Sequence, residues 1–178
     1  MFVCTGNRAR SPLAAALLRQ WAPEHIRVRS VGVLEQGPVP AVEAAIRIAR
    51  EVGVDLSAHR ARSLQRGELA TADLVIGFEP EHVSTAVVDG RARLERTFSL
   101  IELSTVLAEI ARWRGGEDDS GALVELAHAH RPTGFLLAPA IADPFGRSDV
   151  VFRETTRAIE AHVATIARIL FPRVASGA

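Results

Sequence analysis

The sequence predicts an α/β protein built on a parallel sheet with helices on both faces. Short apolar or alternating segments recur between longer Ala- and Leu-rich segments over the N-terminal two thirds of the chain. Hydrophobic residues make up 48% and charged residues 24% of the composition, which is enough apolar material for a folded core. With 178 residues, the chain is expected to form a single domain over residues 1–178.

Four segments have the character of strands. Met1–Val3 has the character of an apolar strand end, and Asp73–Phe78 is a short continuous apolar run, typical of a buried parallel strand. Ile26–Ser30 alternates between apolar and polar residues, and a weaker strand is expected at Arg96–Phe98. Because helical segments separate these strands, we expect right-handed crossovers and a parallel sheet covered on both faces.

Helices are expected between and after the strands. Ser11–Trp21 is rich in Ala and Leu, and its first turn tolerates Pro12. The segment Pro40–Val52 has a helical apolar face, and Gly53 is expected to end it. Residues 114–121 are polar and Gly-rich, and we expect them to be the most mobile segment. The other expected helices are Glu79–Val88, Ile101–Trp113, Gly121–His130 and Arg153–Leu170.

Charge, hydropathy and cysteine content narrow the class of protein. Lys plus Arg and Asp plus Glu both number 21, so no general attraction to nucleic acid or an anionic membrane is expected. No apolar run approaches the ~20 residues that span a bilayer. The N-terminus lacks the layout of a signal peptide. The single cysteine, Cys4, excludes an internal disulfide and a multi-cysteine zinc site, and together these observations indicate a reducing cytoplasm.

The strongest functional signal lies between the first strand and the first helix. Cys4, Arg10 and Ser11 form a Cys-x5-Arg-Ser pattern on a strand–loop–helix turn. A loop wrapped onto a helix N-terminus points backbone N–H groups inward and suits an anion, and such a hollow favours the thiolate form of a cysteine. Arg10 adds a planar fork for phosphate oxygens, and Gly6 allows the sharp turn. The alternative interpretation is that Cys4 is a small buried hydrophobic residue.

A thiolate that attacks a phosphate ester requires an acid to protonate the leaving oxygen. Asp143 precedes Pro144, and a residue before proline is held on an extended or turn segment, which suits an acid that projects from a loop. The alternative is that Asp143 caps a turn before the C-terminal helix. Together with the loop at Cys4, the acid is the favoured interpretation.

These motifs resemble the low-molecular-weight protein tyrosine phosphatase family. The resemblance covers residue 1 to about 90 and about 140 to 170. It implies a four-stranded parallel sheet and phosphomonoester hydrolysis through a cysteinyl-phosphate intermediate, without a metal or other cofactor. The matching segments, in the expected order, are Val3–Asn7, Arg10–Pro12, Val28–Gly32, Asp55–Ser63, Asp73–Ile76 and Asp143–Pro144.

The resemblance also implies a role for individual residues. Cys4 matches the nucleophile, Arg10 the phosphate-binding arginine and Asp143 the general acid. Ser11 would donate a hydrogen bond to the Cys4 thiolate. The phosphate-binding loop would consist of Thr5, Gly6, Asn7, Arg8, Ala9 and Ser11. The polar network that supports this loop would consist of Asn7, Ser11, Ser30 and His59.

Departures from the family pattern leave the substrate open. Ala9 stands where many members carry a second cysteine, which argues against an arsenate reductase and leaves an oxidised Cys4 without a neighbouring thiol. Arg8 replaces a residue that is commonly apolar or Thr, and it either selects substrate or is a solvated rim residue. The chain has no tyrosine, and Phe145 is the remaining aromatic residue expected at the pocket. A phosphorylated protein, a phosphoarginine, a phosphosugar or another small phosphomonoester therefore remain candidate substrates.

Two further expectations concern the chain outside these motifs. Residues Ile101–Ala140 are expected to form a helical insertion of roughly two helices before the Asp-Pro loop, as a lid, a specificity surface or a dimer contact. The second functional candidate is a non-catalytic phosphate-binding module on the same fold. The sequence does not predict the oligomeric state.

Overall fold

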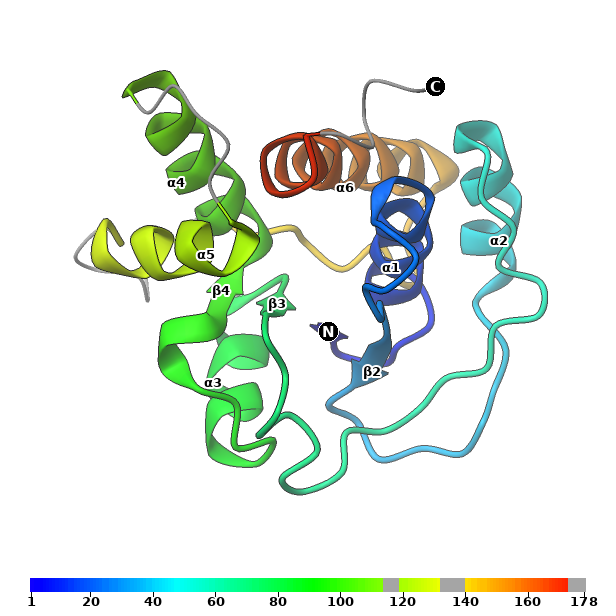
Figure 1. Ribbon diagram of the computed structural model, residues 1–178. Coiled ribbons are helices and arrows are strands. Elements are labelled where there is room, and N and C mark those ends of the chain that lie inside the picture. The colour runs from blue at the N-terminus through cyan, green and yellow to red at the C-terminus, as the bar shows by residue number, and fades with distance from the viewer. Residues whose placement is uncertain (114–118, 132–139, 173–178) are drawn as a thin grey trace.

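A four-stranded parallel sheet forms the centre of the computed structural model, which describes residues 1–113, 119–131 and 140–172 (Figure 1). The strand order is β2–β1–β3–β4. This arrangement confirms the predicted α/β fold class with four parallel strands. The strands are β1 (Phe2–Cys4), β2 (Ser30–Gly32), β3 (Val75–Gly77) and β4 (Thr97–Ser99).

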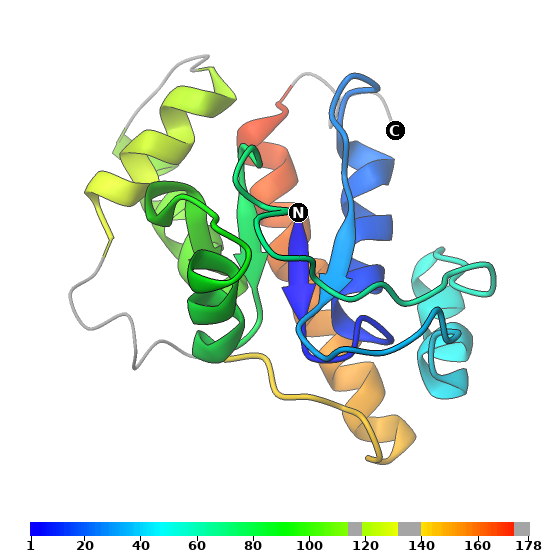
Figure 2. The ribbon, with the colours of Figure 1, turned by 90° about the horizontal axis from the view of Figure 1, so that it is seen from below.

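Helices cover both faces of the sheet, because alternate residues of each strand point to opposite sides. Phe2, Ile76 and Phe98 share one core cluster with residues of α1, α4 and α6. Val3 and Val75 pack on the other side, in a cluster that includes Ala86 of α3 (Figures 1 and 2). The helices are α1 (Arg10–Trp21), α2 (Glu43–Ala49), α3 (Pro80–Val88), α4 (Leu100–Trp113), α5 (Ser120–Ala129) and α6 (Asp149–Leu170), with short 3₁₀ turns at Arg50–Val52 and Leu94–Arg96.

The carboxyl ends of the four strands define one edge of the sheet, where chain segments far apart in sequence meet. In strand order β2–β1–β3, the chain leaves β1 and β3 in opposite directions, which opens a crevice between their carboxyl ends. The segment before α6 crosses this edge (Figure 2), and the Ile141 amide donates to the Phe78 carbonyl at 3.0 Å. The loop after β1, the loop after β3 and the Asp143 segment therefore converge.

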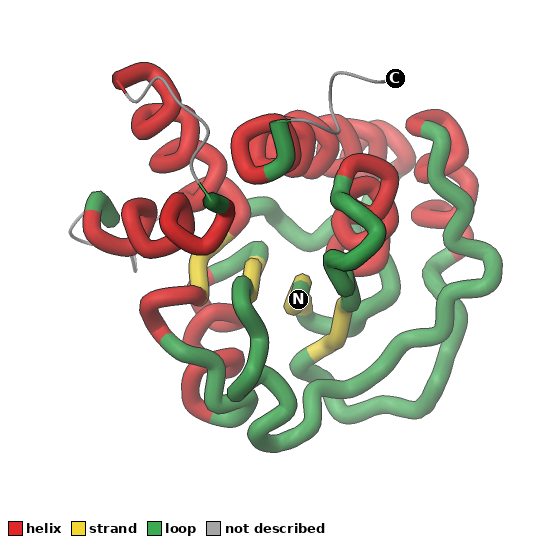
Figure 3. The backbone as a smooth tube through the Cα atoms, in the orientation of Figure 1, coloured by secondary structure: helices red, strands yellow, loops and turns green. Residues whose placement is uncertain are grey.

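Two loops run side by side beyond β2 and border this edge (Figure 3). The Ala61 amide donates to the Val39 carbonyl at 2.8 Å, and Pro40 and Arg60 form an antiparallel bridge. The first loop also contacts the turn after β1, since the Leu34 amide donates to the Thr5 carbonyl at 2.9 Å. The loops therefore support the β1–α1 turn from the side of β2.

Two predicted elements were wrong in their extent. The strand expected at Ile26–Ser30 begins only at Ser30, because Ser30 pairs with Phe2, where β1 begins, and the preceding residues have no neighbouring strand. The helix expected at Pro40–Val52 begins at Glu43, because Pro40 is bridged to Arg60 and the Val42 amide donates to the Arg8 carbonyl. The predicted stop at Gly53 is confirmed by its left-handed φ of 75°.

The other expected elements are present with shifts of a few residues at their ends. The strand expected at Asp73–Phe78 is limited to β3, and the helix expected at Arg153–Leu170 begins earlier, at Asp149. Helices α4 and α5 match the two expected between residues 101 and 130. Residues 114–118 of the predicted mobile segment and residues 132–139 of the predicted insertion lie outside the described residues. None of the described helices has the length and apolarity needed to cross a membrane.

Gly32, the last residue of β2, lies directly against the turn that follows β1. A Cβ atom at Gly32 would lie 2.9 Å from the Thr5 carbonyl oxygen, the Gly6 carbonyl carbon and the Asn7 nitrogen. All three are backbone atoms, so no flexible side chain can move to relieve the contact. The absence of a side chain at Gly32 therefore fixes how closely this turn approaches the sheet.

We predict that Gly32→Ala destabilises the protein and displaces the turn. The expected loss in free energy of unfolding is about 1–3 kcal/mol, the usual cost of overpacking. Urea unfolding measures this loss. Gly37→Ala is the matched control, because a Cβ there meets nothing within 4 Å. Equal stability of the two variants would contradict the prediction.

Candidate active site

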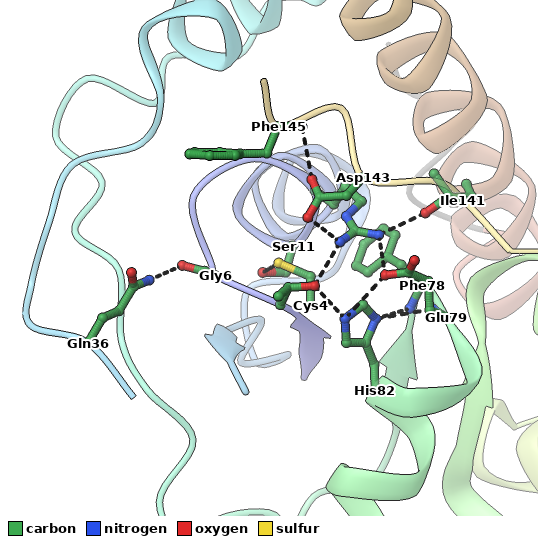
Figure 4. Close-up of polar contacts among 12 residues, drawn as sticks. Cys4, Gly6, Ser11, Gln36, Phe78, Glu79, His82, Ile141, Asp143 and Phe145 are labelled. Carbon is green, nitrogen blue, oxygen red and sulfur yellow. Dashed lines mark hydrogen bonds and ion pairs between the residues drawn. The ribbon is translucent and has the colours of Figure 1, made fainter. Parts of the chain in front are cut away.

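The turn between β1 and α1 forms a cup with Cys4 at its floor (Figure 4). The backbone N–H groups of residues 5–9 donate to no backbone acceptor in the described part of the chain. Their carbonyls are held from outside: the Thr5 carbonyl by Leu34, and the Gly6 carbonyl by the Gln36 side chain. Helix α1 adds the positive end of its dipole to these unpaired donors. The cup therefore suits an anion.

Asn7 holds the cup in shape and is fully buried. Its φ of 49° is left-handed, a conformation that Asn tolerates better than most residues. Its side-chain amide donates to the Ser11 and Ser30 hydroxyls, both at 2.9 Å. Its side-chain oxygen accepts from the Arg62 amide at 2.9 Å, and its carbonyl accepts from His59 Nε2 at 2.7 Å. These four hydrogen bonds offset the backbone strain.

Ser11 lies beside the cysteine. Its hydroxyl oxygen is 2.9 Å from Cys4 Sγ, and Cys4 is 2% exposed. Because that oxygen accepts from Asn7, the hydroxyl proton is left to donate, and the sulfur is closer than the Val31 carbonyl at 3.4 Å. A thiolate at Cys4 would accept this hydrogen bond.

Arg10 is 1% exposed, and its guanidinium lies between two carboxylates (Figure 4). Nη1 donates to Glu79 Oε2 at 2.7 Å and to the Ile141 carbonyl at 2.9 Å. Nη2 donates to Asp143 Oδ2 at 2.7 Å and to Thr5 Oγ1 at 3.0 Å. All four terminal N–H bonds of Arg10 therefore have acceptors within the protein. Of the two carboxylates, Asp143 is the more accessible, with 37% of its side chain exposed against 30% for Glu79.

His82 lies behind Arg10, on α3. Its Nδ1 accepts from the Phe78 and Glu79 amides at 3.3 and 3.1 Å, so the proton of the neutral ring is on Nε2. Nε2 is 3.0 Å from Thr5 Oγ1 and donates to it. Burial, together with the charge of Arg10, lowers the pKa of His82 to about 4. The ring is therefore neutral near pH 7, and Arg10 supplies the positive charge here.

Arg8 and the exposed residues Phe145 and Leu34 belong to the segments that border the cup. Arg8 Nε donates to the Pro40 carbonyl at 2.9 Å, and its guanidinium lies 5.8 Å from the centre of the Phe145 ring. Phe145 and Leu34 are 59% and 52% exposed. The Phe145 amide donates to Asp143 Oδ1 at 3.1 Å, which ties the position of this aromatic ring to the acid.

The structure brings the residues singled out in the sequence into one place. Cys4, Arg10 and Asp143 meet at the cup, and Ser11, Ser30 and His59 surround Asn7 as expected. Ala9 packs with Ala45, Ile48 and Phe152, on the side of the loop away from Cys4. Among the described residues, no cluster of His, Cys, Asp and Glu has the makings of a metal site.

Sequence reasoning missed Glu79 and His82, which contact the Arg10 side of the site. The signal that could have found them is their position just after β3, the strand beside β1 on the far side from β2. Side chains that follow such a pair of strands face the crevice where ligands bind in open α/β sheets.

The fold and the site together define an α/β protein with a cysteine-centred anion-binding loop. The sequence model described as "Low molecular weight phosphotyrosine protein phosphatase" matches residues 1–105, and the chain belongs to this family. The match ends within α4.

Two curated relatives from bacteria match parts of the chain. It is 40% identical over 76 residues to a probable low molecular weight protein-tyrosine-phosphatase, EpsP, of Ralstonia nicotianae, covering 43% of this chain and 52% of that protein. It is 33% identical over 100 residues to a protein-arginine-phosphatase of Geobacillus stearothermophilus, covering 56% of this chain and 67% of that protein. The chain thus spans about half the length of the first curated relatives.

The likeness of fold extends over nearly the whole chain. The YwlE arginine phosphatase from Geobacillus stearothermophilus superposes with a TM-score of 0.69 at 25% identity, covering 99% of this chain and 95% of that chain. The tyrosine phosphatase Wzb from Escherichia coli K30 superposes with a TM-score of 0.68 at 23% identity, covering 94% of each chain.

We predict that His82 makes stability depend on pH between about 6.5 and 4. The unfolded chain binds a proton at its histidines near pH 6.5, whereas buried His82 resists protonation until its pKa of about 4. The stability contributed by the neutral ring is therefore present above pH 6.5 and is lost as the pH falls, by about 3 kcal/mol in total.

Chemical unfolding of the wild type and of His82→Gln at several pH values measures this effect. The difference in free energy of unfolding between the two proteins should shrink from pH 6.5 to pH 4. Other titrating groups are common to both proteins and cancel. Parallel stability curves would contradict the prediction.

Proposed function

We propose that this protein hydrolyses phosphomonoesters through a cysteinyl-phosphate intermediate. The observation that carries the proposal is one cup that holds a buried cysteine, a serine beside its sulfur, unpaired backbone donors and an arginine. A phosphoryl group in this cup would lie directly above Cys4, with its oxygens facing the N–H groups of residues 5–9.

In the first step, Cys4 Sγ attacks phosphorus as the bond to the leaving oxygen breaks. The loop amides and Arg10 stabilise the three equatorial oxygens, and Asp143 donates its proton to the leaving oxygen. In the second step, Asp143 takes a proton from water, the water oxygen bonds to phosphorus, and the S–P bond breaks. Ser11 donates to Cys4 Sγ and stabilises the departing thiolate.

Substrate binding exchanges one anion for another at Arg10. Arg10 Nη2 donates to Asp143 Oδ2 in this structure, so a phosphoryl oxygen that binds Nη2 must take that N–H bond. Asp143 is the partner that gives way, because its side chain is more exposed than that of Glu79, at 37% against 30%, and because Glu79 Oε2 also contacts His82 Nε2 at 3.5 Å. Released from the guanidinium, the Asp143 carboxyl is free to carry the proton that the leaving oxygen needs.

For the substrate, we favour a phosphotyrosine-type aryl ester on a protein, in a cytoplasmic setting, over phosphoarginine. Arg8 places a positive charge at the rim, which disfavours the guanidinium group of phosphoarginine. The exposed Phe145 and Leu34 side chains offer apolar contact to an aromatic leaving group. Faster turnover of a phosphoarginine peptide than of a matched phosphotyrosine peptide would reverse this preference.

We predict that the wild type turns over p-nitrophenyl phosphate in the presence of EDTA and that Cys4→Ser does not. The proposed chemistry uses protein groups alone, so chelation should leave the rate unchanged. Calorimetry with inorganic phosphate checks that Cys4→Ser keeps a folded cup. A wild type that binds phosphate without turnover would instead identify a phosphate-binding module.

We predict that Asp143→Ala has opposite effects on turnover and on affinity. Loss of the acid should lower kcat by about a hundredfold to ten-thousandfold. Loss of the carboxylate that competes at Arg10 should tighten inorganic phosphate binding by about tenfold. Asp149→Ala is the matched control, because Asp149 pairs with Arg47 on the surface. Weaker phosphate binding in Asp143→Ala would exclude the exchange at Arg10.

A further inference from the structure

We propose that the Thr5 hydroxyl donates a further hydrogen bond to a phosphoryl oxygen in the cup and that His82 fixes its orientation. The inference rests on the proposed function for the identity of the anion. It concerns a side chain, whereas the cup described above is lined by backbone donors, Arg10 and the cysteine.

The hydrogen bonds of Thr5 leave its proton unassigned. Oγ1 accepts from Arg10 Nη2 and from His82 Nε2, both at 3.0 Å. His82 must be the donor in its contact, because its Nδ1 already accepts two backbone N–H bonds. A hydroxyl has two acceptor sites and one proton. Both acceptor sites are filled, and no group in the described part of the chain accepts the proton.

The two donors also set the direction of that proton. Both contacts come from the side of Arg10 and α3, so the O–H bond points away from them. Thr5 follows Cys4 directly and is partly exposed, in contrast to its buried neighbour. An anion that replaces Asp143 at Nη2 would be bound to the same nitrogen that donates to Thr5. Its oxygens would then lie near the Thr5 O–H bond, which has no acceptor yet.

His82 is held in place well enough to act as a positioning residue. It is 2% exposed, and a Cβ on Gly77 of β3 would lie 3.0 Å from its own Cβ. Its Nε2 is also 3.5 Å from Glu79 Oε2, which in turn accepts from Arg10. Arg10, Thr5, His82 and Glu79 therefore form a closed ring of polar contacts (Figure 4).

Calorimetric titration of the whole protein with inorganic phosphate and with vanadate tests the proposal. Thr5→Val, which keeps the shape and removes the hydroxyl, should weaken phosphate binding by about tenfold or more, the range for a hydrogen bond to a charged group. Thr5→Ser should restore the affinity. Thr85→Val on α3 is the matched control, and thermal unfolding checks that each variant is folded.

A double variant distinguishes a positioning role from a structural one. If His82 acts through Thr5, adding His82→Gln to Thr5→Val should weaken phosphate binding no further, whereas independent structural effects add. Thr5→Val with wild-type affinity, additive losses, or a wild type that binds neither anion would each overturn the proposal. Because binding is measured without turnover, an inactive wild type with Thr5-dependent binding would refute the proposed function alone.

Discussion

The charge balance around the Arg10 guanidinium is the constraint on which the site depends. A cation with 1% exposure is stable only if it is paired and fully hydrogen bonded, and here two carboxylates, a carbonyl and a hydroxyl supply the acceptors. The two carboxylates differ in what they can do. Glu79 is a fixed counter-charge, and Asp143 occupies the N–H bond that an incoming anion requires. In the proposed mechanism, the Asp143 carboxylate therefore holds the place at Arg10 that a phosphoryl oxygen would take.

The same pairing connects parts of the chain that the short strands alone would not hold together. Arg10 begins α1, Glu79 precedes α3, and Asp143 lies on the segment before α6, which is also hydrogen bonded to Phe78. The opposite wall of the cup depends on Asn7 and on the close approach of Gly32. The side of the cup at Arg10 is thus stabilised by ion pairs. The side at Asn7 is stabilised by buried neutral hydrogen bonds, and Gly32 leaves room for the turn to approach the sheet. Because His82 is neutral near pH 7, it adds no second positive charge next to Arg10.

Most of the proposed catalytic residues could be predicted from sequence because they lie close together in the chain. Cys4, Gly6, Arg10 and Ser11 lie within one turn, and a strand followed by such a turn and a helix has few possible geometries. Asp143 could also be predicted from the sequence, because the proline that follows it restricts its backbone. Glu79 and His82 could not be predicted as site residues in this way, because an acidic residue and a histidine three residues apart are also common at the start of a helix. Their role depends on the strand order, which brings β3 beside β1. The start of β2, expected at Ile26 and found at Ser30, likewise depends on where its partner β1 begins.

Ala9 shows how this loop keeps its shape without a second cysteine. Its methyl group packs with Ala45 and Ile48 of α2 and Phe152 of α6, so the side of the loop that faces away from the anion is part of the core. A cysteine at position 9 could contribute both to packing and to redox chemistry, whereas the Ala9 methyl group contributes only to packing. Since Cys4 is the only cysteine in the chain, its oxidised form has no intramolecular thiol to condense with. Recovery from oxidation must then come from an external thiol that reaches a sulfur 2% exposed at the floor of the cup. An anion bound above that sulfur would block the same path. A bound substrate would therefore also shield Cys4 Sγ from oxidants and from external thiols.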